Sequence, residues 1–491
     1  MLLKKEQLKG RIEPHIYDNL KLDEYSLFKV KSRKLLSTNR LDVGFKLYYL
    51  EYIDKNDFIA RDVYFKSLKA NKLFNIKEFG NNKKNSLKDF EFFFNELHDK
   101  IKIKGFDIKQ SILPLNINYE LLNGSHRLAI SSFLNKEISY IKTECKDFEK
   151  QDYEYFYKRN VEKNYIEKAV ESFSIFSDDI YIAFIWPRAN INYDFIRSKF
   201  DNILYYKEIQ LSFSGGHYLI SEIYSGDYWT GDYTDKYKGS LGKVKECFNS
   251  YNPLRVLYFK ELDKKKVLKI KQEIRDICNV GKHSIHITDH KYEVNKISKI
   301  LLNENSLEFL NKANIFRFKE NFKIIKDFKQ FLKNNNIDIE DIVVDSSFVM
   351  SLYGIRKAKD LDYICISNGQ NPLNKFFNQV KNNDLNYHDD SIKDLIFDSK
   401  NFFYFQGIKF LTLKKIFNKK KKRAEQKDLT DVKLIESYLE GNTLKLILNN
   451  IRQKKYYITV IIRVYTIKFL KFLKIHRYIK SIYNYLTRRD E

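Results

Sequence analysis

Two aspartates in the last third of the chain, Asp360 and Asp362, carry the clearest chemical signal in the sequence. They are separated by one residue in a segment typical of a β-strand, and the period-2 alternation of a strand places both carboxylates on one face. Two carboxylates on one edge suit Mg²⁺, which keeps several waters and binds through carboxylates and substrate phosphates. We therefore expect Asp360 and Asp362 to be catalytic metal ligands. The simpler interpretation is that they are ordinary acids at the end of a strand.

A pair of serines precedes these aspartates. The apolar strand expected at 341–344 leads to Ser346 and Ser347 at the start of a helix, where free backbone N–H groups and hydroxyls can hold a polyphosphate. Arg356 follows, and two roles remain open for it. It either clamps a phosphate through two parallel hydrogen bonds or pairs with Asp360 at the surface.

This order of residues resembles the nucleotidyltransferase superfamily of minimal antibiotic- and sugar-modifying enzymes, whose signature is Gly-Ser followed by Asp-x-Asp. The resemblance covers about residues 320–440 and implies Mg²⁺ as cofactor, a nucleoside triphosphate as substrate and Lys427 as a phosphate contact. Ser346 stands where that family usually has glycine. For the family's third carboxylate, which often serves as the base for the acceptor hydroxyl, the candidates are Asp394 and Asp398.

A second motif lies near the N-terminus. Gly124, Ser125, His126 and Arg127 follow a short strand at 111–115 and open a helix, so the turn can form a nest of backbone N–H groups for an anion. The segment resembles the Gly-x-His-Arg box of partition-protein nuclease-like domains, sulfiredoxins and related small-molecule kinases, and it implies nucleotide binding or phosphoryl transfer. Two alternatives remain: a capped helix in which His126 and Arg127 bond neighbouring carbonyls, and DNA binding.

The middle of the chain carries a third motif. Arg275, His286 and Asp289 resemble the catalytic stretch of nucleoside diphosphate kinases, which implies a ferredoxin-like α/β sandwich and a transiently phosphorylated His286 that faces Arg275. Trp186 departs from the family, because an indole replaces a cationic phosphate ligand. His283 is expected on the opposite face of the same strand, so the two histidines do not form a metal pair.

The pattern of elements predicts a multidomain α/β (α+β) protein. The expected units are 1–150, a partition/sulfiredoxin-like phosphate-binding domain; 171–313, the kinase-like sandwich; 320–441, the nucleotidyltransferase domain; and 442–491, a basic amphipathic tail. In the second unit we predict strands at 203–213, 254–260 and 283–287, with helices at 188–200, 216–225, 263–279 and 291–302. In the third we predict a helix at 322–335 and paired strands at 392–397 and 402–411.

Composition and charge limit the kinds of partner that the protein can have. The chain has 491 residues and a formal charge of +25, with 43% hydrophobic residues, so it has ample core material and a strong attraction for anions. Lysine is spread evenly, which favours small phosphorylated substrates over nucleic acid. The four cysteines stand apart, with no disulfide framework or zinc site, and we predict neither secretion nor a membrane span. A cytoplasmic location is expected.

The tail alternates apolar and cationic residues at helical spacing. A helix of this kind either lies at an anionic membrane surface, which makes the protein peripheral, or docks on the protein's own core. We thus expect a Mg²⁺-dependent enzyme, with a kinase-like module, that transfers a nucleotidyl group to a sugar, a polyol or its phosphate for cell-surface polysaccharide synthesis. The rivals are a partition-like nucleic-acid-binding protein and a nucleotidyltransferase toxin that modifies tRNA or protein.

Overall fold

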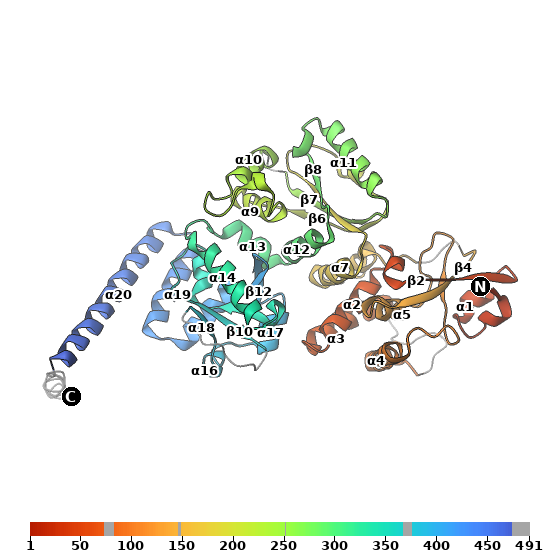
Figure 1. Ribbon diagram of the computed structural model, residues 1–491, viewed down its shortest axis with the longest axis horizontal. Coiled ribbons are helices and arrows are strands. Elements are labelled where there is room, and N and C mark those ends of the chain that lie inside the picture. The colour runs from red at the N-terminus through yellow and green to blue at the C-terminus, as the bar shows by residue number, and fades with distance from the viewer. Residues whose placement is uncertain (73–82, 146–148, 251, 367–375, 474–491) are drawn as a thin grey trace.

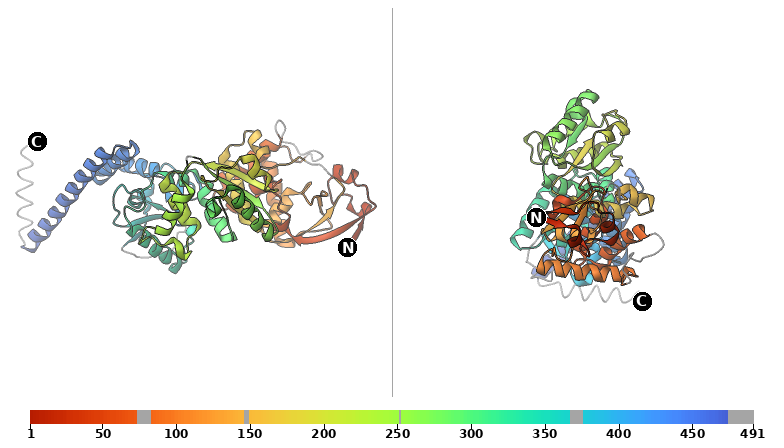
Figure 2. Two further views of the ribbon diagram at one scale, coloured as in Figure 1. Left: turned by 90° about the horizontal axis from the view of Figure 1, so that it is seen from above. Right: turned by 90° about the vertical axis from the view of Figure 1, so that its right-hand side faces the viewer.

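Three small sheets, each with its own helices, make up the protein (Figure 1). The structure is a computed structural model that describes residues 1–72, 83–145, 149–250, 252–366 and 376–473. Mixed α/β architecture throughout these residues confirms the expected class. The N-terminal sheet and the long C-terminal helix lie at opposite ends of an elongated molecule (Figure 2).

The first sheet has the order β1-β2-β4-β3, in which only β3 and β4 are parallel. Helix α5 connects these two strands, because parallel neighbours require a crossover. The strands are β1 (Leu2–Lys4), β2 (Glu24–Lys31), β3 (Leu113–Leu115) and β4 (Glu137–Lys142). The helices are α1 (Pro14–Asp18), α2 (Asp42–Tyr52), α3 (Asp57–Lys72), α4 (Leu87–Lys104), α5 (Ser125–Phe133), α6 (Tyr153–Lys158) and α7 (Lys163–Phe176).

The second sheet has the order β6-β7-β5-β8, and every neighbouring pair is antiparallel. Its strands are β5 (Ile180–Ile185), β6 (Ile203–Ile209), β7 (Leu254–Lys260) and β8 (Ile285–Ile287). Its helices are α8 (Tyr193–Ser198), α9 (Phe213–Ile223), α10 (Lys238–Cys247), α11 (Lys264–Cys278), α12 (Lys291–Leu301) and α13 (Glu304–Lys312). Two interleaved strand–helix–strand crossovers therefore build this sheet, with α10 as a helix that the sequence did not predict.

The third sheet has the order β11-β10-β9-β13-β12 and is mixed. Its strands are β9 (Ile342–Asp345), β10 (Leu361–Cys365), β11 (Phe377–Gln379), β12 (Phe402–Phe405) and β13 (Ile408–Leu411). Its helices are α14 (Glu320–Asn334), α15 (Ser347–Leu352), α16 (Asn382–Leu385), α17 (Ile392–Phe397), α18 (Leu413–Arg423) and α19 (Gln426–Leu439), followed by α20 (Thr443–Phe472).

Two expectations about the last unit are wrong. Residues 392–397 form helix α17 and not a strand, because Ser391 caps them by accepting a hydrogen bond from the Asp394 backbone N–H at 3.1 Å. The strand pair lies within 402–411, where β12 and β13 form a hairpin. Gln406 and Gly407 at its turn both have positive φ, the geometry of a two-residue type I′ turn.

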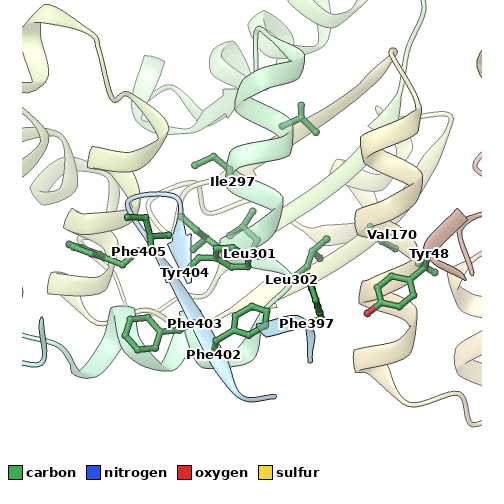
Figure 3. Packing of buried hydrophobic residues seen from close by; sticks show 14 of the residues in the cluster. Tyr48, Val170, Ile297, Leu301, Leu302, Phe397, Phe402, Phe403, Tyr404 and Phe405 are labelled. Carbon is green, nitrogen blue, oxygen red and sulfur yellow. The ribbon is translucent and has the colours of Figure 1, made fainter. Parts of the chain in front are cut away.

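The three sheets share one hydrophobic core. Tyr48 of α2, Leu302 after α12 and Phe397 of α17 belong to a single buried cluster that reaches from the first sheet to the third (Figure 3). Helix α7 packs on α2 and contains Glu171, so the expected start of the second unit falls inside a helix. The units are thus joined through apolar side chains and not through linkers.

Helix α20 packs on α19 and then projects from the body (Figures 1 and 2). None of the helices in the described ranges is both long and apolar enough to cross a membrane.

Candidate functional site

A cavity of about 1410 Å³ lies in the third unit and gathers the residues that the sequence singled out there. Its wall includes both aspartates and the serine pair, together with the two predicted phosphate contacts. These predicted residues are Asp360, Asp362, Ser346, Ser347, Arg356 and Lys427. The structure therefore brings six separately predicted side chains to one place.

Strand pairing positions the aspartates and the serines. Asp362 is the second residue of β10, and Asp360 immediately precedes that strand. Antiparallel pairing sets Asp362 opposite Asp345, the last residue of β9, so the chain leaves β9 beside the aspartates and continues into Ser346. Ser347 is the first residue of α15, as predicted.

Ser346 adopts a backbone conformation that favours glycine. Its φ is +64° and its ψ is −143°, a region that costs a residue with a Cβ about 1–3 kcal/mol. The Ser346 N–H donates to the Asp345 carboxylate at 2.6 Å, and its side chain hydrogen-bonds to Asp362. Glycine would adopt this conformation without strain, whereas the hydroxyl gives the serine a partner that glycine lacks.

The surroundings of Asp362 disfavour its charged form. Burial raises the pKa of its carboxyl, and the nearby charges of Asp360 and Asp345 raise it further, against hydrogen bonds from Asn378 and Ser346. The Asn378 amide donates to Asp362 at 3.4 Å. A cation beside Asp360 and Asp362 would lower this pKa, because it favours the ionised carboxylates.

Asp345 lies behind the cavity wall, where its carboxylate is paired with a lysine and a histidine. Its carboxylate pairs with the Lys419 ammonium and accepts a hydrogen bond from His388 Nε2 at 3.2 Å. Although burial raises the pKa of Asp345, Lys419 and His388 hold it well below its ordinary value. Asp345 is 0% exposed, and only Lys419 of this cluster reaches the cavity. The sequence does not reveal this cluster, because its members lie far apart in the chain.

Asp431 of α19 is a second buried carboxylate, and three side chains of the cavity wall bond to it. Arg356 donates two hydrogen bonds to it, each at 2.7 Å, while Lys420 pairs with it at 2.9 Å and Gln453 donates to it at 2.7 Å. Arg356 therefore pairs with Asp431 and not with Asp360, contrary to one of its two expected roles. Gln453 belongs to α20, so the tail helix forms part of the cavity.

Cations outnumber acids around the cavity. Among the described residues, eleven Lys and Arg side chains line it against six Asp and Glu. Lys427 is half exposed and pairs with Glu425 at 3.0 Å, which leaves its ammonium near open solvent. Lys323, Lys381 and Lys454 line the cavity from three different segments. A ligand with several negative charges therefore fits this cavity best.

The predicted third carboxylates lie elsewhere. Asp394 is in the first turn of α17, where it accepts hydrogen bonds from Asn56 at 2.9 Å and from Ser391 at 2.7 Å. Asp398 pairs with Lys400 at 2.8 Å. Neither belongs to the cavity wall. The predicted strand at 392–397 would have carried Asp394 along the sheet, whereas the helix turns it toward the first unit.

Residues 124–127 of the first unit form the predicted turn before a helix. Gly124 has a φ of +95° and caps α5, and a Cβ there would meet Leu113 at 2.4 Å. Arg127 pairs with Glu13 at 2.8 Å and bonds the Ser111 hydroxyl, so its guanidinium is already satisfied by the protein.

His126 bonds the Tyr64 hydroxyl at 2.8 Å. Burial lowers the pKa of His126 well below its ordinary value, which leaves it uncharged at neutral pH. Ser125 starts the helix.

His126 and Arg127 therefore bond side chains and not the neighbouring carbonyls that the capped-helix alternative expected. A phosphate at this turn would have to displace Glu13 from Arg127. Anion binding by Gly124 and Ser125 stays a prediction.

His286 lies on the face of the second sheet that packs against α12. Its Nε2 contacts Glu293 at 2.9 Å, and its ring lies 4.7 Å from that of Tyr224. The neighbouring Ile285 and Ile287 point to the other face, where they pack with Ile274 of α11. No hydrogen bond or ion pair joins His286 to Arg275 in the part of the chain that the structure describes.

The other residues of this motif have different surroundings. The Arg275 side chain has a buried Nε without a hydrogen-bond partner among the described residues. Asp289 lies 3.7 Å from Lys271. His283 is in a short 3₁₀ helix before β8, not in the strand, and its Nδ1 lies 3.9 Å from the Cys247 thiol. The bonds of His286 fit a packed histidine in the sheet, and its phosphorylation stays a prediction.

Across the described residues, no group of three or more His, Cys, Asp or Glu side chains is placed to hold a metal ion. Comparison of the chain with protein-family models, with curated proteins and with solved structures finds no match.

Proposed function

We propose that the cavity of the third unit is the active site of a Mg²⁺-dependent nucleotidyltransferase that acts on a small hydroxylated acceptor. The observation that carries the proposal is the shared position of Asp360, Asp362 and Ser346 in a cavity rich in cations. The acceptor's hydroxyl oxygen would bond to the α-phosphorus as the bond to the departing pyrophosphate breaks, and the hydroxyl proton would pass to water. A sugar, a polyol or its phosphate is the acceptor class that we infer.

The donor set supports Mg²⁺. Asp360 and Asp362 provide two oxygen ligands, and the raised pKa of Asp362 marks a position where a cation relieves burial and like-charge repulsion. Bound there, Mg²⁺ would supply charge neutralisation for the phosphates. The side chains of Asn378 and Ser346 hydrogen-bond to Asp362 and hold it in orientation.

The size and charge of the cavity support a second ligand beside the nucleotide. Ligand pockets are usually about 300–1,000 Å³, and this cavity measures about 1410 Å³. Lys427 and Lys381 carry positive charge that a triphosphate and an anionic acceptor can share. Arg356 bonds to Asp431 in the cavity wall. We keep Arg356 as a proposed contact for a phosphate of the ligand.

We assign the units to fold families on topology. The order β6-β7-β5-β8 with antiparallel neighbours supports a ferredoxin-like sandwich for the second unit. The parallel pair β3–β4 around the Gly124 turn supports a partition/sulfiredoxin-like first unit. Strands β9 and β10, with the serine turn between β9 and α15, support a nucleotidyltransferase fold for the third.

A thermal-unfolding screen with the four common ribonucleoside triphosphates tests the proposal. We expect at least one of them to raise the unfolding temperature only with Mg²⁺, since a ligand at 100 times its Kd stabilises by about 2.7 kcal/mol. That nucleotide should release pyrophosphate when an acceptor is added. No stabilisation by any nucleotide, together with salt-sensitive duplex binding, would favour the nucleic-acid-binding alternative. Transfer of label to tRNA or protein would favour the toxin.

A further inference from the structure

Helix α20 is held to the body by one polar face. Asn449 donates a hydrogen bond to the Ser437 hydroxyl at 2.9 Å, and Gln453 donates to Asp431 at 2.7 Å. Both partners belong to α19, and Asn449 and Gln453 are buried. The first half of the helix is therefore fixed relative to the cavity, and the second half continues beyond the body (Figure 1).

The opposite face of α20 is an uncovered apolar stripe. Eight large side chains follow at alternating spacings of three and four residues, with one gap at Lys455, which places them on one side of a helix. We call them the outward stripe: Leu444, Leu448, Ile451, Ile458, Ile462, Tyr465, Phe469 and Phe472. Their exposed fractions run from 55% at Leu448 to 81% at Phe472. Apolar stripes of this extent on a protein surface mark an interaction site.

The charge of helix α20 indicates which kind of partner the outward stripe binds. Residues 443–473 contain seven Lys and Arg and no Asp or Glu. A second copy of this helix would bring seven further positive charges to the stripe and no acid to pair with them. An anionic lipid surface supplies both an apolar layer for the stripe and opposite charge for Arg463, Lys468 and Lys471.

We propose that the outward stripe binds the surface of an anionic membrane, with α20 lying in the plane of the interface. A helix of 30 residues is about 45 Å long, and cationic residues along it keep it at the headgroups. The same helix lines the cavity with Asn450, Gln453 and Lys454, so this attachment holds the cavity beside the lipid headgroups. The proposal does not depend on nucleotidyl transfer.

Co-sedimentation of the full chain with vesicles tests this assignment. We expect binding to vesicles of phosphatidylcholine and phosphatidylglycerol in equal parts, and at least about tenfold weaker binding to phosphatidylcholine alone, since each Lys or Arg near an anionic surface strengthens binding several-fold. The double variant Ile458→Glu, Ile462→Glu should weaken binding to the mixed vesicles by at least about tenfold. Added salt should weaken the binding of the parent.

Val464→Glu is the matched control. Val464 is exposed but lies two residues after Ile462, on the other side of the helix, so the same apolar-to-acid change leaves the stripe intact. We expect Val464→Glu to bind nearly as the parent does, and both variants to keep the parent's unfolding temperature. Equal binding of the parent to both kinds of vesicle, or no binding, would overturn the proposal. So would a dimer in light scattering that only the double variant dissociates.

Discussion

Asp345 and Asp362 lie directly opposite each other on antiparallel strands β9 and β10, yet the two carboxylates have opposite environments. Lys419 and His388 neutralise Asp345 in the interior, whereas Asp362 lines the cavity beside a second acid and has a raised pKa. Asp345 is paired within the protein at the end of β9, whereas Asp362 lies where a cationic ligand would favour its ionised form. This division of roles gives the first predictions.

Replacement of both cavity aspartates, Asp360→Asn with Asp362→Asn, should abolish Mg²⁺-dependent pyrophosphate release while the protein stays folded. Each change removes a carboxylate that we propose binds the metal and also relieves repulsion between the two acids, so the unfolding temperature should hold or rise. Asp276→Asn, which removes an exposed acid on α11, is the control. Pyrophosphate release is measured with the nucleotide found in the thermal screen, and unchanged release in the double variant would refute the assignment.

Two variants of Ser346 should separate the effect of backbone strain on stability from the effect of the lost hydrogen bond. Ser346→Gly removes the Cβ that opposes a φ of +64°, whereas Ser346→Ala keeps the Cβ, and both lose the bond to Asp362. We expect the glycine variant to be more stable than the alanine variant by about 1 kcal/mol in denaturant unfolding. Equal stability of the two variants would show that the turn is unstrained.

Lys419→Met should destabilise the protein by about 3 kcal/mol, because it leaves Asp345 buried without its cationic partner. The pKa of Asp345 is lowered in the folded state, so the stability that this ion pair contributes is present above its ordinary value of 3.8 and is lost as the pH falls. The difference between parent and variant should therefore shrink in acid. Lys419→Arg, which keeps the charge, should lose much less, and urea titrations at several pH values provide the measurement.

Glu171 predicts a pH dependence at the junction of the units. Burial raises its pKa to about 7, and Glu51 and Glu340 raise it against Lys299 and Lys168. A carboxyl with a raised pKa in the folded state costs stability as the pH rises from about 4.5 through 7. We expect Glu171→Gln to unfold at the parent's temperature near pH 4.5 and at a higher temperature above pH 7. Glu96→Gln, an exposed change, should show no such divergence.

The sequence predicted the local geometry of the site well, because its motif consists of the end of one strand, the start of one helix and the start of the next strand. Ser346, Ser347 and Asp362 could be placed from those elements alone. The short apolar run at 392–397 does not distinguish a strand from a helix by periodicity. The cap at Ser391 was the available signal, and with it Asp394 would have been removed from the candidate site.

Contacts between distant segments could not be predicted. Lys419 and Lys420 look like part of a solvated run of lysines, yet each pairs with a buried aspartate. Gln453 reads as a polar residue of the tail and instead bonds Asp431 in the cavity wall. His286 and Arg275 have the order in the chain that the resemblance requires, but order alone does not determine which partner each side chain bonds to.

The continuous core that joins Tyr48, Leu302 and Phe397 has a consequence for how the protein can be divided. A break at either boundary between units would expose matching apolar surfaces on both pieces, and the Asn56–Asp394 hydrogen bond would be cut as well. We therefore expect that the units do not fold as independent domains. Rotation of the units about a hinge would have to break part of this shared core, so we expect movements within the third unit to open the cavity to substrate.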